Sequence, residues 1–358
     1  MSRYIVRRVL YSIPVLIGII MLVFILARVI PGDPCTATYG EKATPELCAQ
    51  FSVRYGLDKP IYEQFVIYLG SIAQGDLGSS IRYGRPVTDI LIERLPVTVE
   101  LTILAMIFAT VGGVTLGMVS AIRRNSPADV GTMVFANLGV SIPVFVLGLV
   151  LAYIFAVLLK GTPFALPPSG RLSPGVSVTP LAVAWGLENL EGTPRALLDF
   201  ASNIYLFNTL VTAHFTTFVD AFRHLILPAI AVGTIPLAII ARMTRSSLLE
   251  VLGLDFVRTA RAKGLPERTV IYRHGMRNAM LPVITVVGLS LGAFLSGAIL
   301  TETIFNLTGM GRTLFEAIEG RDYIVIQGVT IVVAVAYLVV NLVVDVSYAV
   351  LDPRIRLS

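Results

Sequence analysis

The chain has 358 residues, of which 55% are hydrophobic and only 14% are charged, and its formal net charge is +5. Soluble domains carry roughly 25% charged residues, so this composition excludes an ordinary water-soluble protein and indicates an integral membrane protein. Because the basic residues flank apolar stretches, we assign the positive charge to membrane orientation and expect no nucleic-acid partner.

Six apolar stretches are long enough, or nearly so, to cross a bilayer, whose hydrocarbon core takes roughly 20 helical residues. They predict an all-α bundle of six transmembrane helices that forms a single domain over residues 1–358. The fourth stretch is the shortest and contains Pro228 and Pro236, which leaves a re-entrant segment open as an alternative. The predicted spans are 9–30, 97–122, 132–159, 225–241, 281–304 and 324–350.

The distribution of Lys and Arg predicts how these spans are oriented. If the N-terminus is cytoplasmic, the inner segments contain 15 Lys and Arg against 5 Asp and Glu, whereas the longer outer segments contain 12 against 15. Basic residues are retained on the cytoplasmic side, so both termini are predicted to be cytoplasmic. The inner segments are 1–8, 123–131, 242–280 and 351–358, and the outer ones are 31–96, 160–224 and 305–323.

Residues 203–219 are apolar enough to suggest a seventh span, but Asn203, Asn208 and His214 interrupt them. A seventh span would also move the basic segment 242–280 to the outside. We therefore predict an interfacial or extracytoplasmic helix here, within the enlarged outer segment 160–224.

Both cysteines, Cys35 and Cys48, fall in the first outer segment. An oxidising compartment permits a disulfide between them, and two free thiols are the alternative that the spacing leaves open. Two cysteines are too few for a four-cysteine metal site.

The segment between the fourth and fifth spans is basic and contains helix signals. Residues 242–252 are predicted to continue the fourth span as a helix that ends at Gly253. Asp255 is a candidate N-cap for a short helix over 256–263, and Gly264 suits the left-handed position after that helix. A second helix is predicted over 267–278. Such a segment is either a basic loop held against anionic lipid headgroups or a part that another protein binds.

Sequence motifs distinguish these alternatives. The segment RMTRSSLLEVLGLDFVRTARAKGL, followed by RHGMRNAMLP, resembles the cytoplasmic loop of permease subunits in ATP-binding-cassette importers, in the subclass that serves dipeptides, oligopeptides and nickel. Thr259, Ala260 and Arg261 occupy the places of the Glu-Ala-Ala that begins this loop in the wider family. Further motifs of the subclass follow in order: PGDP at 31–34, GDLGSSI at 75–81, RLPVTVELT at 94–102, GAILTETIF at 297–305, GMGR at 309–312, RDY at 321–323 and DPRIR at 352–356.

The resemblance implies the type I importer permease fold and a division of labour. A second homologous permease subunit would complete the pathway, two cytoplasmic ATPase subunits would bind ATP and Mg, and an extracytoplasmic binding protein would supply substrate at the plasma (inner) membrane of a prokaryote. This chain would bind no cofactor or metal itself, and it contains no G-x-x-x-x-G-K-[ST] motif. The residues implied in ATPase coupling are Asp255, Phe256, Val257, Arg258, Thr259, Ala260, Arg261, Ala262, Lys263 and Gly264.

Polar residues inside the spans are candidates for the translocation path or its gates, because such residues are costly in lipid and usually face a cavity or a partner. The candidates are Glu100, Asn137, Glu302 and Asn341. For Glu100 and Glu302, exposure at the interface without substrate contact is the alternative. Asp345 is expected to pair with an arginine of the inner loop.

Two other classes of function are disfavoured. A membrane-embedded protease would need a Ser–His pair, two aspartates or a zinc site within the spans, and the three histidines lie outside the predicted spans. An ATP-independent carrier or channel would show mid-span charge relays or inverted repeats, and neither is evident. We therefore expect a non-catalytic permease for peptides. A nickel chelate, glutathione or an oligosaccharide is the alternative substrate.

Overall fold

The computed structural model describes residues 2–29, 33–295 and 299–351. All regular structure in these residues is helical, apart from an isolated antiparallel bridge between Ser79 and Pro86. The all-α prediction is therefore confirmed over the described chain. Some predictions fall on residues outside the described ones. These are residue 30 of the first span, 31–32 of the PGDP motif, 296–298 of the fifth span and the C-terminal residues 352–358 with the DPRIR motif.

The longest helices coincide with five of the six predicted spans. They are α1 (Ser2–Val29), α5 (Val87–Ile122), α11 (Phe215–Leu252), α14 (Arg277–Leu295) and α17 (Tyr323–Leu351). Their hydrophobic residues provide the apolar length that a crossing needs. Between them lie α2 (Pro34–Tyr39), η1 (Gly40–Lys42), α3 (Pro45–Arg54), α4 (Ile61–Ala73), α6 (Pro127–Ser141), α7 (Val144–Ala152), η2 (Tyr153–Leu158), α8 (Leu181–Ala184), α9 (Gly192–Asn203), α10 (Tyr205–Val211), α12 (Asp255–Ala262), α13 (Glu267–Thr269), η3 (Val270–Met276), α15 (Ile299–Ile304) and α16 (Met310–Glu319).

The third predicted span, 132–159, is not a straight helix. Here the helix axis bends by 102° between α6 and the continuous unit of α7 and η2. Pro143 follows the break, and Ile142 before it has the extended conformation that a following proline favours. By length and composition, the described chain thus has five helices able to cross a membrane, or up to six if this bent pair forms one span.

The fourth span, predicted to be the weakest, lies within the longest helix of the described chain. Helix α11 has 38 residues, contains both Pro228 and Pro236, and buries 72% of its most apolar stretch inside the protein. The re-entrant alternative is therefore wrong for this span, because neighbouring helices surround the positions that the prolines weaken. Helix α11 also begins earlier than predicted, so residues 215–219 belong to it and the buried His224 lies inside it.

Helices α5 and α11 pack closely through small residues. A Cβ on Gly113 would lie 2.7 Å from the carbonyl oxygen of Leu237, and one on Gly117 would contact the carbonyl oxygen of Ala241 and the side chain of Thr244. The side-chain-free surface of α5 thus receives the backbone of α11, as small-residue faces do in membrane bundles.

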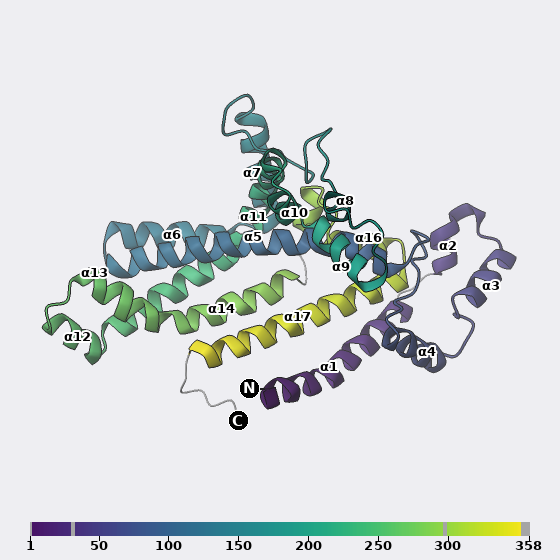
Figure 1. Ribbon diagram of the computed structural model, residues 1–358, viewed down its shortest axis with the longest axis horizontal. Helices are drawn as coiled ribbons and strands as arrows, with labels where there is room; N and C mark the ends of the chain where they lie inside the picture. Colours follow the sequence, from purple (N-terminus) through teal and green to yellow (C-terminus); the bar gives the residue numbers. More distant parts are fainter. Residues whose placement is uncertain (1, 30–32, 296–298, 352–358) are drawn as a thin grey trace.

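Two groups of short helices between the spans lie at opposite ends of the molecule (Figure 1). Figure 1 shows α12 and α13 at one end of the long axis and α2 and α3 at the other. Helices α1 and α17 pack against each other beside the α5–α11 pair. The predicted fifth span, 281–304, comprises α14 and α15, and residues 296–298 between them lie outside the described residues.

Candidate functional site

Helix α12 lies between α11 and α13, and its ends differ slightly from the prediction. Helix α11 continues to Leu252 and ends at Gly253, as predicted. Asp255 is the first helical residue and not the N-cap, a position held by Leu254, and the Asp255 carboxylate accepts a hydrogen bond from Arg258 at 3.3 Å instead of from backbone amides. Gly264 has φ +72°, so the predicted left-handed position is confirmed.

The two faces of α12 have different surroundings. Val257 and Ala260 are buried against Val270 of η3 and against Val251 and Leu252 of α11. Val257, one of the residues implied in ATPase coupling, therefore anchors α12 to its own chain. The opposite face is exposed and consists of Phe256, Arg258, Thr259, Arg261, Ala262 and Lys263.

An exposed ion pair joins the end of α12 to α13. The Nη2 atom of Arg261 lies 2.7 Å from Oε1 of Glu267, and its Nε lies 3.1 Å from Oε2. These hydrogen bonds raise the pKa of the Arg261 guanidinium above its already high ordinary value, so that it stays charged. The second predicted helix, 267–278, is the first part of a longer helical segment, because α13 continues through the π-helix η3 directly into α14.

The carboxylate of Glu100, a candidate for the translocation path, is hydrogen-bonded to residues of the outer segment 160–224. Its carboxylate accepts a hydrogen bond from Arg171 at 2.8 Å and one from the backbone amide of Leu206 at 2.6 Å. Its side chain is only 2% exposed. Glu100 thus ties α5 to this segment, whatever further role it has in transport.

Glu302, the second acidic candidate, is also buried. Its carboxylate accepts a hydrogen bond from the hydroxyl of Thr98 at 2.7 Å and one from the backbone amide of Arg312 at 2.9 Å, in the first turn of α16. A Cβ on Gly309 would collide with Thr98 and the Glu302 carboxylate, so the absence of a side chain at 309 makes this approach possible. A carboxylate is favourable at a helix N-terminus, where backbone amides lack partners.

The remaining polar candidates lie apart from these two. Asn137 is exposed on α6. Asn341 lines a cavity of about 250 Å³ between α1 and α17, together with Arg8, Ser12 and Asp345. Oδ2 of Asp345 lies 3.0 Å from Nη2 of Arg8, which belongs to α1 and not to the loop 242–280. The prediction that Asp345 pairs with an arginine of that loop is therefore wrong.

Several motifs that are distant in sequence meet in one hydrogen-bond network. The buried carboxylate of Asp322 accepts hydrogen bonds from the hydroxyl of Ser80 at 2.5 Å and the amide of Arg82 at 3.0 Å. Glu316 accepts from the hydroxyl of Tyr83 at 2.8 Å and from Nε of Arg312 at 2.8 Å. Burial opposes ionisation of Glu316, but these hydrogen bonds outweigh it and lower the pKa of that carboxyl. The sequence marked these motifs but gave no indication that they touch.

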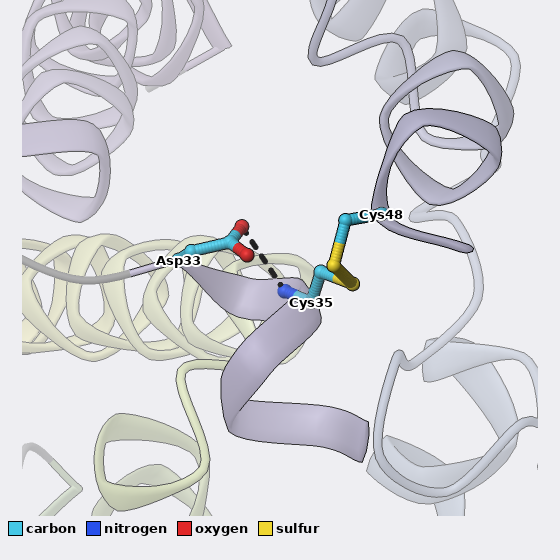
Figure 2. Close-up of side chains that lie close together, drawn as sticks. All are labelled: Asp33, Cys35 and Cys48. Carbon is cyan, nitrogen blue, oxygen red and sulfur yellow. Dashed lines mark hydrogen bonds between the residues drawn. A yellow bond between two sulfur atoms is a disulfide. The ribbon is translucent and has the colours of Figure 1, made fainter. Parts of the chain in front are cut away.

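A disulfide joins Cys35 of α2 to Cys48 of α3. Figure 2 shows this bond and the neighbouring carboxylate of Asp33, which accepts a hydrogen bond from the amide of Cys35. The three side chains lie close enough to suggest a metal site. With both sulfurs in the disulfide, no thiolate is available as a ligand, and Asp33 instead caps the start of α2.

An apolar cavity of about 490 Å³ lies where α7, α11, α14 and α15 meet. None of Glu100, Asn137, Glu302 and Asn341 lines it. Its wall is mostly apolar, with the hydroxyl residues Ser290 and Thr301, and none of these residues is charged, which explains why the sequence did not single them out. The lining includes Val144, Pro236, Ile239, Ser290, Phe294 and Thr301.

Comparison with known proteins identifies the family. Residues 113–357 match the sequence profile of the binding-protein-dependent transport system inner membrane component, and residues 1–102 match the N-terminal profile of the corresponding membrane component. Together these two matches cover nearly the whole chain. The chain belongs to this family of permeases.

Several similar proteins are peptide transport permeases. The permease is 44% identical over 356 residues to a dipeptide transport system permease protein of Alkalihalophilus pseudofirmus, with 99% of this chain and 100% of the relative covered. It is 43% identical to a di/tripeptide transport system permease protein of Pseudomonas aeruginosa, with 99% of each chain covered. An oligopeptide transport system permease protein of Bacillus subtilis is 38% identical, with 99% and 100% covered.

Proposed function

We propose that this permease imports dipeptides and other short peptides across the inner membrane, driven by ATP that partner subunits hydrolyse. The observation that carries the proposal is α12, a short helix packed on α11 and η3 through Val257 and Ala260, with its other face free for a partner. The peptide transport functions of the relatives, which match along their full length, support peptides as the substrate class.

Each partner has a defined role in this proposal. A second homologous permease subunit supplies the other half of the pathway. Two cytoplasmic ATPase subunits bind ATP and Mg, and one of them receives the exposed face of α12. An extracytoplasmic binding protein captures the peptide and sets much of the selectivity. This chain positions the substrate path and performs no catalysis itself.

The direction of energy flow follows from this arrangement. Closure of the ATPase subunits displaces α12, and the spans move between inward-facing and outward-facing states. A partner can shift such an equilibrium only if it binds the two states with different affinities. Both termini are cytoplasmic in this scheme, as the distribution of Lys and Arg predicts.

The proposal is tested with the complete complex in proteoliposomes, with ATP inside and the binding protein and a labelled dipeptide outside. We expect dipeptide uptake that requires ATP and the binding protein. Uptake that persists without ATPase subunits would support an ATP-independent carrier or channel instead. Uptake of a labelled nickel chelate, glutathione or oligosaccharide without uptake of the dipeptide would contradict the substrate class.

A further inference from the structure

We propose that the ion pair between Asp129 and Arg245 is a positioning link that makes the bent α6–α7 unit move together with α12 during transport. We call α12 the coupling helix, because its exposed face is the part that an ATPase subunit would bind. Arg245 lies on the part of α11 that leads to α12, and Asp129 lies in the first turn of α6. The inference rests on the proposed function, because it concerns how movement of α12 reaches the spans.

The geometry of the pair is bidentate, with the carboxylate of Asp129 buried and the side chain of Arg245 30% exposed. Nε of Arg245 lies 2.8 Å from Oδ1 of Asp129, and Nη2 lies 2.8 Å from Oδ2. The hydroxyl of Ser120 and the backbone amide of Asn125, 3.0 Å away, also donate to this carboxylate. The Asp129 side chain is only 7% exposed. Two parallel hydrogen bonds fix both the distance and the relative orientation of the partners.

On one side, the pair is connected to α12 by a continuous helix and close packing. Helix α11 runs unbroken from Arg245 to Leu252, about two turns. Val251 and Leu252 then pack against Val257 and Ala260 of α12. A displacement of α12 is therefore transmitted through its buried face to the end of α11.

On the other side, the pair is connected to the bend. Helix α6 runs from Asp129 to Ser141, next to the 102° angle between α6 and the α7 unit. Near its far end, Gly139 of α6 closely approaches Thr234 of α11. Helix α6 thus contacts α11 near both ends, by apolar packing near the bend and by the ion pair at Asp129.

The ion pair adds a constraint that apolar packing does not supply. Packed apolar helices can shift along each other with modest changes in free energy, whereas moving Arg245 away would leave the buried carboxylate of Asp129 without its cation. The pair therefore fixes the register of α6 on α11. Without the ion pair, α11 could move with α12 while the bent α6–α7 unit keeps its position.

The test uses the complete complex and compares peptide taken up per ATP hydrolysed. Arg245→Lys keeps the charge but cannot form the bidentate contact. The double variant Asp129→Asn with Arg245→Gln keeps polar partners and leaves no buried charge, so it remains informative if a single variant fails to assemble. We expect the ratio to fall by at least about fivefold in both, the lower end of typical coupling between sites.

The control is Arg195→Lys in α9. Arg195 also binds both oxygens of one carboxylate, that of Asp199, at 3.0 and 2.9 Å, but both residues lie in the same helix. We expect its ratio to equal that of the wild type. An equally reduced ratio in this control would show that loss of any such pair has this effect and would overturn the inference.

The outcomes separate this inference from the proposed function. A wild-type complex that couples uptake to ATP, with wild-type ratios in both Arg245 variants, would overturn the link and leave the proposed function intact. Lower thermal stability with an unchanged ratio would assign the pair to folding alone and would also overturn the link. A wild-type complex without ATP-dependent uptake would overturn both.

Discussion

Gly264 closes the coupling helix with a backbone conformation that most residues avoid. Its φ is +72°, and an added Cβ would meet no atom within 4 Å. A Gly264→Val substitution is therefore opposed by backbone strain alone, by about 1–2 kcal/mol. We expect weaker closure of α12 and less peptide taken up per ATP hydrolysed, measured in the reconstituted complex.

Gly264→Asn is the matched control, because asparagine tolerates the left-handed conformation better than a β-branched residue. We expect it to retain most of the coupling. If valine and asparagine behave alike, and both like the wild type, the conformation of Gly264 has no role in coupling.

Glu302 combines two contacts whose loss can be measured. Its carboxylate accepts hydrogen bonds from Thr98 and from the amide of Arg312. In Glu302→Gln, the NH2 group either meets the amide of Arg312 with a second donor or makes the Thr98 hydroxyl turn from donor to acceptor, and the charged acceptor is lost. We expect a loss of roughly 1–3 kcal/mol, seen as a lower midpoint of thermal unfolding, with an unchanged KM for peptide in the protein that remains folded.

Glu319→Gln, at an exposed carboxylate near the other end of α16, is the control and should leave the midpoint unchanged. A raised KM in Glu302→Gln with an unaltered midpoint would instead make Glu302 part of the substrate path.

The same residues show what the sequence could reveal at this scale. Glu100 stood out because an acidic residue in an apolar stretch needs a reason. Its partner Arg171 is 71 residues away, and no local pattern connects them. Gly264 was predictable in detail because a helix end depends on local backbone geometry. Asp129 and Arg245, which form the proposed link, lie in polar segments where charges are unremarkable.

At the scale of elements, the disulfide joins two short outer helices, α2 and α3. The cysteines are 13 residues apart, and closing a loop of this size removes about 3 kcal/mol of unfolded-state entropy in the simple loop model. We expect Cys48→Ser to make residues 34–54 more sensitive to protease. Limited proteolysis of right-side-out vesicles, followed by mass mapping, measures this.

A membrane-impermeant maleimide provides the control for the same element. In the wild-type protein it should react only after reduction, at both cysteines. Labelling without a reductant would show that the two thiols are free.

The third and fourth spans show the limit of predicting elements from apolar length. Both prolines of α11 weakened the prediction of a helix, yet α11 is continuous because packing against α5 supports it. Pro143 lies inside a longer apolar stretch, and there the chain turns sharply. A proline's effect depends on whether neighbouring helices enclose the backbone around it, which a sequence read without tertiary contacts cannot supply.

At the scale of the whole molecule, the number of crossings and the orientation depend on each other. Five described helices are long and apolar enough to span, and the bent α6–α7 unit decides between five and six. With six crossings both termini share one side, whereas with five they do not. With six crossings the basic segment around α12 lies on the side of the N-terminus, whereas with five it lies on the opposite side, because only α1, α5 and α11 then precede it.

Reporter fusions test whether the bent unit crosses. If α6 and α7 cross as one span, a fusion after residue 125 and one after residue 265 lie on the same side, and one after residue 190 lies on the other. We expect cytoplasmic signals at 125 and 265 and an extracytoplasmic signal at 190, because Arg123, Arg124 and the eight basic residues of 242–280 are retained inside. Equal signals at 125 and 190 would mean that the bent unit re-enters on the side it left. In that case α11 would carry α12 to the extracytoplasmic side, out of reach of any ATPase, and the proposed coupling would be wrong.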